Sequence, residues 1–140
     1  MVDNIKIKIS NLYKVFGRKP AAAMEHVRDG ATKQSLLDDH GHVLGLRDIN
    51  IDIPEKRIQV IMGLSGSGKS TLIRHINRLI EPTEGQMIVD GDDVLAMSQD
   101  DLREFRRNKL SMVFQKFALL PHRTVAQNAA YGLTIQGIAE

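Results

Sequence analysis

The sequence contains no cysteine. That absence excludes disulfide bonds and thiolate-ligated metal sites, and it suits a reducing cytosol. Long apolar runs are also lacking, because no stretch approaches the roughly 20 residues that a membrane-spanning helix needs. Residues 1–4 lack the charged and apolar regions of a signal peptide, so we expect a soluble chain on the cytoplasmic side.

A strong charge of either sign is missing as well. The formal net charge is +2 at pH 7, and aromatic residues make up only 4% of the chain. The basic residues between positions 103 and 109 follow or flank acidic ones, as is typical of a solvated helix face. No basic stretch is interleaved with aromatic residues, so we expect no nucleic-acid partner. A length of 140 residues fits one domain or part of one.

Hydrophobic periodicity predicts an α/β fold. Alternating isoleucines and short apolar runs predict strands, and amphipathic runs predict helices. The expected strands cover 5–9, 49–53, 58–62, 86–90 and 110–114, and the expected helices cover 69–80 and 98–108. Ser98 resembles the first residue of a capping box that opens the second helix. Residues 91–93 are expected to form a turn, and the chain after Phe117 a loop and then a helix.

Residues 18–42 break this alternation. Their composition predicts one or two short helices inserted between strands. The three histidines of this stretch, His26, His40 and His42, do not share a ligand spacing on one helix face. We therefore expect no metal site there.

The most informative stretch of the sequence is a phosphate-binding loop. It has the pattern Gly-x-x-x-x-Gly-Lys-Ser between the predicted strand 58–62 and the predicted helix 69–80. Glycines leave the backbone N–H groups free to curl round a phosphate, and the N-terminus of the following helix attracts the same anion. The residues concerned are Gly63, Leu64, Ser65, Gly66, Ser67, Gly68, Lys69, Ser70 and Thr71.

Two side chains of this loop carry chemistry. Lys69 is placed to reach the β- and γ-phosphates of a nucleotide, and the Ser70 hydroxyl is placed to ligate Mg²⁺. With a strand before the loop and a helix after it, a simple glycine-rich turn is a poor alternative. The sequence therefore predicts a nucleoside triphosphate site.

Other candidates are less specific. Gln115 comes directly after the predicted strand 110–114, where a carboxamide could touch a metal or an attacking water beside the sheet, although a surface role is the commoner one. Tyr13 and Phe16 come after the first strand, and either ring could stack on an adenine or simply pack. Spacing alone does not choose between them.

These motifs together resemble the nucleotide-binding subunit of ATP-binding cassette (ABC) transporters, over essentially the whole chain. Within that family the chain is most similar to the glycine betaine/proline (quaternary amine) importers. The resemblance is carried by 11–17 (NLYKVFG), 61–71 (IMGLSGSGKST), 77–83 (NRLIEPT), 112–115 (MVFQ) and 117–122 (FALLPH).

The resemblance implies roles for particular residues. Phe16 falls where the family places its base-stacking aromatic residue, 63–71 match the Walker A loop, and Gln115 matches the Q-loop glutamine. ATP and Mg²⁺ would be the cofactors. Lys69 and Gln115 would be catalytic, and Ser70 and Gln115 would contact the metal.

The resemblance also implies a domain organisation. Residues 1–140 would be a partial ABC nucleotide-binding domain, a P-loop NTPase fold with an amino-terminal β-subdomain and phosphate-loop core, truncated after the Q-loop. Residues 18–44 would be a subfamily insertion, and 116–140 the start of the helical subdomain.

The same resemblance implies partners. Membrane permease subunits, a substrate-binding protein and a second copy in a head-to-tail dimer would be among them. The subunit would lie peripherally on the cytoplasmic side of the inner membrane and energise import of an osmoprotectant such as glycine betaine or proline.

The chain departs from the family after Gln115. A Leu-Ser-Gly-Gly signature, a Walker B strand and a switch histidine do not occur between Lys116 and Glu140. We therefore expect an amino-terminal fragment that does not hydrolyse ATP by itself. A non-catalytic, truncated nucleotide-binding remnant is the alternative. A small P-loop kinase is a further one, but such kinases place the loop nearer the amino terminus.

Overall fold

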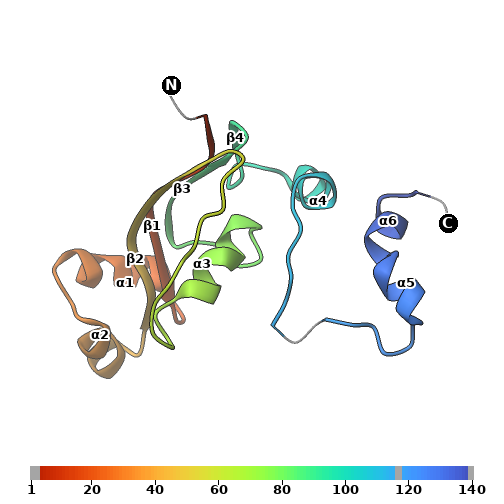
Figure 1. Cartoon of the computed structure of the whole chain (residues 1–140). Helices are drawn as coiled ribbons and strands as arrows, with labels where there is room; N and C mark the ends of the chain where they lie inside the picture. The colour runs from red at the N-terminus through yellow and green to blue at the C-terminus, as the bar shows by residue number, and fades with distance from the viewer. Residues whose placement is uncertain (1–3, 116–117, 139–140) are drawn as a thin grey trace. The chain divides into compact units, whose positions relative to one another are not determined.

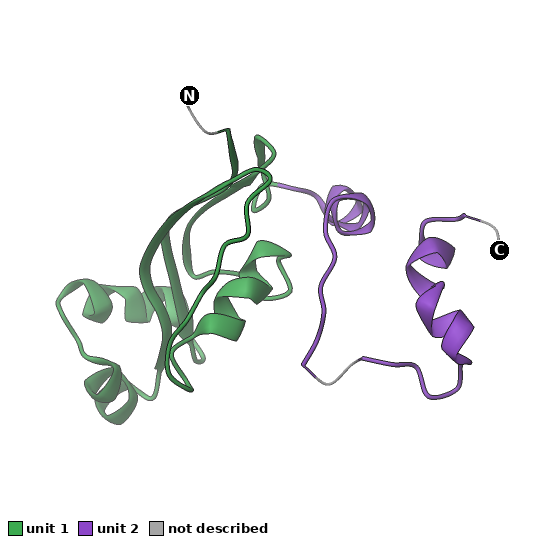
Figure 2. Ribbon diagram, viewed as in Figure 1, with its two compact units in different colours: residues 1–96 green, residues 97–140 purple. Residues whose placement is uncertain are grey.

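The computed structural model describes residues 4–115 and 118–138. The chain divides into two compact units, Met1–Ala96 and Met97–Glu140, which Figure 2 colours separately. Each unit has its own elements and is described by itself.

A four-stranded antiparallel sheet forms the centre of the first unit. Strand β1 pairs with β2 on one side and with β3 on the other, and β3 pairs with β4, giving the order β2-β1-β3-β4. The isoleucine alternations at 5–9 and 49–53 lie in β1 and β2, as predicted, and face each other in pairs such as Ile9 and Ile51. The strands are β1 (Ile5–Phe16), β2 (Val43–Pro54), β3 (Glu84–Val89) and β4 (Asp92–Asp93). The last of these was predicted as a turn.

Two helices fill the connection between β1 and β2, which confirms the prediction for residues 18–42. Helix α1 (Pro20–Arg28) has proline at its start, and α2 (Lys33–His40) is opened by a capping box from Thr32. Their apolar faces pack on the sheet and lie across it from α3 (Figure 1). The cluster consists of Val15, Ala23, Met24, Val27, Leu36 and Leu44, with Tyr13 and Ala31 against its edge.

Helix α3 (Lys69–Ile76) comes after the glycine-rich loop and ends earlier than predicted. Position 78 explains the early end, because Arg78 has a left-handed backbone with φ of +50°. The Leu79 N–H donates to the Arg74 carbonyl, five residues back, at 2.9 Å and also to the Asn77 side-chain oxygen at 3.3 Å, which closes the end of the helix. Leu72 and His75 form the buried face of the helix.

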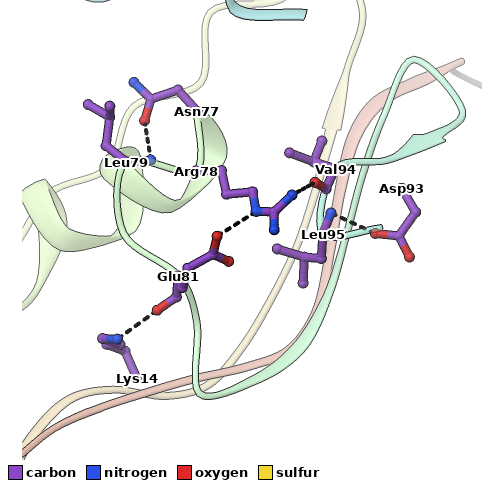
Figure 3. A network of polar contacts seen from close by, with 8 residues as sticks. All are labelled: Lys14, Asn77, Arg78, Leu79, Glu81, Asp93, Val94 and Leu95. Carbon is purple, nitrogen blue, oxygen red and sulfur yellow. Dashed lines mark hydrogen bonds and ion pairs between the residues drawn. The ribbon is translucent and has the colours of Figure 1, made fainter. Parts of the chain in front are cut away.

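A polar network fixes the segment after α3 to the sheet (Figure 3). The Arg78 guanidinium donates to a Glu81 carboxylate oxygen at 2.7 Å and to the Val94 carbonyl at 3.1 Å. Lys14 of β1 donates to the Glu81 carbonyl at 2.6 Å. Burial lowers the pKa of Lys14, and the charge of Glu81 partly offsets that effect. The far end of α3 is thereby anchored to β1 and to the β3–β4 hairpin.

The predicted strands 58–62 and 110–114 are not strands. Ile58, Val60 and Met62 are 94%, 63% and 86% exposed, and Val113 is 95% exposed. A buried parallel strand exists only through its neighbours in the sheet, and no described segment pairs with either stretch. The apolar pattern indicates burial, but within the described residues the partner strands are not present.

The second unit is helical. Helix α4 (Gln99–Asn108) begins after Ser98, whose hydroxyl accepts from the Asp101 N–H, and it buries Leu102 and Phe105, which confirms the predicted helix. Two short helices, α5 (Val125–Ala129) and α6 (Tyr131–Ile135), confirm helical structure in the final stretch. Residues 116 and 117 lie outside the described residues. Among the helices described, none has the length and apolar character to cross a bilayer.

His75 should make stability depend on pH. Its ring is fully buried, Nδ1 bonds to the Thr71 carbonyl at 2.7 Å, and Nε2 has no hydrogen-bond partner in the described structure. Desolvation lowers the His75 pKa below its ordinary 6.5, against the opposing effect of the Thr71 carbonyl. The unfolded chain therefore binds this proton more readily than the folded chain.

The free energy of unfolding should accordingly fall as the pH drops below about 6.5, and the contribution of His75 should be fully present above it. His75→Leu should flatten this dependence between about pH 7.5 and about pH 5.5. Urea unfolding of the wild type and of the variant at both pH values measures the free energies. An identical slope in wild type and variant would show that His75 is not responsible.

Candidate functional site

The glycine-rich loop leads directly into α3. After β2 the chain runs back along the sheet before it reaches this helix (Figure 1). Gly68 caps α3 with a left-handed backbone at φ of +94°, a conformation that glycine adopts without steric penalty. The first N–H groups of α3 have no partner within the helix and carry its partial positive charge. The loop and helix together thus form the local structure that binds anions.

Lys69, the first residue of α3, directs its ammonium group back into the loop. Lys69 Nζ donates to the carbonyls of Gly63 and Leu64 at 2.7 and 2.8 Å, and lies 3.4 Å from Ser67 Oγ. The ammonium therefore sits inside the curve of the loop. A phosphate oxygen would compete for the same three donor protons and offers a charged acceptor in place of neutral carbonyls.

A cavity of about 250 Å³ lies between the loop and the sheet. It brings together residues from β1, β2, α2 and the phosphate loop, and no carboxylate side chain lines it. The lining residues are Phe16, Lys33, Val43, Leu44, Gly45, Gly66, Ser67, Gly68, Lys69, Ser70 and Thr71. Two lysines and a helix N-terminus therefore give the cavity a positive potential.

Most of the predicted site residues meet here. Phe16 and residues 66–71 line the cavity, while Gly63, Leu64 and Ser65 do not. The first two of these still contribute their carbonyls to Lys69. Gln115 is an exposed residue of the second unit. Its role stays a prediction.

The two candidate aromatic rings lie in different environments. Phe16 lines the cavity and is 38% exposed, with Lys14 Nζ 5.0 Å from its ring centroid. Tyr13 instead packs against the apolar cluster beneath α1 and α2. Tyr13 is half-buried against this cluster and does not line the cavity, whereas Phe16 does.

Two glycines control how closely these parts approach. A Cβ on Gly68 would lie 2.8 Å from the Gly45 carbonyl oxygen, and a Cβ on Gly45 would lie 2.6 Å from the Phe16 ring. Neither separation is sterically tolerable. Gly45 and Lys33 were both missed by sequence reasoning, since each joins the site only through the tertiary fold. A glycine inside a strand, as Gly45 is in β2, is a weak signal of a close backbone approach.

The histidines of the 18–44 segment contact one another and the nearby backbone. The rings of His26 and His40 stack with centroids 3.9 Å apart, and His42 Nδ1 lies 2.6 Å from the His40 carbonyl. Within residues 4–115 and 118–138, no group of three or more His, Asp or Glu side chains is arranged to hold a metal ion.

Comparison with known proteins agrees with this geometry. The family model for ABC transporters matches residues 46–140. The chain is 51% identical over 135 residues to the glycine betaine/proline betaine transport system ATP-binding protein ProV of Salmonella typhimurium, covering 96% of this chain and 34% of that protein. It is 51% identical over 134 residues to the glycine betaine transport ATP-binding protein OpuAA of Bacillus subtilis, covering 96% and 32%.

Solved structures show the same likeness. The ATP-binding cassette MJ0796, determined as a dimer in a post-hydrolysis state bound to ADP and Pi, superposes with a TM-score of 0.72 at 30% identity. The match covers 93% of this chain and 47% of that one. This chain is a member of the ABC transporter family and has part of the mixed α/β fold of its ATP-binding cassettes. It spans about a third of the length of the curated relatives it matches.

The close contact at Gly68 can be tested by comparing two glycines of one loop. Gly68→Ala forces a left-handed alanine and a clash with the Gly45 carbonyl, whereas Gly66→Ala forces only the first, since open space surrounds a Cβ there and φ is +76°. The Gly66 variant should lose about 1 kcal/mol of unfolding free energy. The Gly68 variant should lose roughly 2–4 kcal/mol.

Chemical denaturation of both variants and the wild type provides the measurement. Equal losses at the two positions would mean that the loop does not pack on β2 through Gly68.

Proposed function

We propose that this chain binds the nucleotide in the ATP-binding subunit of an importer for an osmoprotectant, either a quaternary amine such as glycine betaine, or proline. The observation that carries the proposal is the cavity that joins Phe16 to the phosphate loop without any lining carboxylate. Sequence identity of 51% to two glycine betaine transport subunits supports the substrate class.

The residues present fit a nucleoside triphosphate. Residues of the loop and of the first turn of α3 line the cavity, and their backbone N–H groups would receive phosphate oxygens. Lys69 would bind the β- and γ-phosphates, exchanging its contacts with the Gly63 and Leu64 carbonyls for charged acceptors. Phe16 would stack on the adenine at the other end of the cavity.

The residues also fit a magnesium ion at one end of the phosphates. Ser70 is exposed at the start of α3, lines the cavity and offers a hydroxyl oxygen, a ligand type that Mg²⁺ prefers. When bound, Mg²⁺ neutralises charge on the phosphate oxygens. Gln115 would join the metal site and pass the state of the nucleotide to residues 116–140.

Hydrolysis needs more than phosphate binding. Phosphoryl transfer depends on an oriented water and on donors that stabilise the γ-phosphate. By family resemblance these come from the Walker B strand, the switch histidine and the signature of a second, head-to-tail copy, none of which occurs in residues 116–140. We therefore propose that Lys69 and Gln115 contribute to turnover only together with those elements.

The proposed role implies partners. Permease subunits would contact the helical stretch 116–140, a substrate-binding protein would deliver the amine, and the subunit would lie peripherally on the cytoplasmic face of the inner membrane.

Lys69→Ala tests the phosphate site directly. The variant should bind ATP more weakly by about 1.5–3 kcal/mol, the scale of a charge-assisted hydrogen bond. Titration calorimetry on the purified protein measures the loss. If wild type and variant bind ATP equally well, the loop does not hold the phosphates.

The choice of aromatic ring is tested by paired variants. Phe16→Ala should weaken ATP binding by on the order of 1 kcal/mol, and Phe16→Tyr should largely preserve it. Tyr13→Ala is the matched control, because Tyr13 packs against the apolar cluster and should affect stability instead of affinity. The assignment is wrong if affinity falls with Tyr13→Ala and not with Phe16→Ala.

A further inference from the structure

Apolar packing and hydrogen bonds hold the 18–44 segment against the sheet. Val27 and Leu36, one from each helix, join the buried cluster with Val15 and Leu44 of the sheet. Arg47 of β2 donates to the Ala31 carbonyl in the link between the helices, and to the Val27 carbonyl at 3.4 Å. The start of α2 therefore has a defined place beside β2.

Lys33 begins α2 and extends toward the phosphate loop. Its ammonium group donates to the Gly66 carbonyl at 3.4 Å, and the side chain lines the same cavity as Lys69. The contact joins two segments far apart in the sequence. At this length and to a neutral acceptor the bond is weak, so it does not by itself explain the position of the lysine.

The electrostatic surroundings of Lys33 are unfavourable to a cation. It occupies the first residue of a helix, where the partial positive charge of the helix repels it, and the first turn of α2 contains no acidic residue. Among the described residues Lys33 forms no ion pair. Lys69 and the N-terminus of α3 add further positive charge around the same cavity. An anion in the cavity would relieve this repulsion.

We propose that Lys33 is a second phosphate-binding lysine, which the 18–44 segment contributes to the nucleotide site. The inference rests on the proposed function and deepens it. Lys33 Nζ exchanges the Gly66 carbonyl for an oxygen of the nucleotide phosphates, a charged acceptor that forms a stronger bond. Bound nucleotide then connects the 18–44 segment with the phosphate loop.

The test measures two ligands against matched lysine variants. Titration calorimetry with ATP and with tripolyphosphate, which lacks the base and ribose, should show a loss of roughly three- to tenfold for Lys33→Met with both ligands, as expected for an exposed charged contact. Lys33→Arg should retain most of the affinity. The dependence of binding on salt concentration should also be shallower in the methionine variant.

Lys19→Met is the control, because Lys19 is an exposed lysine of the same segment that does not line the cavity. Its affinities should match those of the wild type, and thermal unfolding should show that both methionine variants fold. Unchanged binding of both ligands to Lys33→Met would overturn the proposal. So would a loss for ATP alone, since Lys33 would then only shape the wall around the base.

Failure of the proposed function itself gives a different result. A folded wild type that binds neither ligand would overturn the nucleotide site, and with it the role of Lys33. Binding that depends on Lys69 and is indifferent to Lys33 would leave the nucleotide site intact and remove only this inference.

Discussion

The site depends on a close backbone contact between β2 and the start of α3. Gly68 approaches the Gly45 carbonyl so closely that a Cβ would lie 2.8 Å from the oxygen, and Gly45 in turn leaves room for the ring of Phe16. Both approaches require a residue without a side chain. The spacing between the Phe16 ring and the phosphate loop therefore depends on the absence of a side chain at Gly45 and at Gly68. A nucleotide has its base and its phosphates at opposite ends, so a preorganised spacing between the two subsites lowers the cost of ordering the site on binding.

The sequence predicts correctly those elements that are stabilised by contacts between residues close together in the chain. Ser98 predicts the start of α4 because its cap uses the N–H of Asp101, three residues along the chain. The predicted strands 58–62 and 110–114 failed for the opposite reason. An apolar run records a preference for burial, but a ladder also needs a partner strand, and the partner is specified elsewhere. The exposed side chains of Ile58 and Met62 show the consequence.

The residues of the site also fall into those that the sequence predicts and those that only the tertiary fold brings together. The loop motif could be read directly, since the anion-binding N–H groups and Lys69 are consecutive in the chain. Phe16 could be distinguished from Tyr13 only by the family resemblance. In the structure the two rings lie in different environments, because residues three apart in a strand point to opposite faces of the sheet. Lys33 could not be found at all. It is separated from the loop by a whole strand, and the contact exists only because Arg47 and the buried cluster place α2 beside β2.

The two ends of α3 lie in different electrostatic surroundings. Lys33, Lys69 and the positive end of α3 surround one cavity without a carboxylate in its lining, and like charges in proximity destabilise the folded state. At its other end α3 is secured by neutral and oppositely charged contacts, through the buried ring of His75 and the bonds of Arg78 to Glu81 and Val94. These contacts stabilise the helix in the orientation that directs its N-terminus at the cavity. In the free protein the positive groups around the cavity repel one another. A bound anion attracts all of them and offsets this repulsion, which increases its affinity.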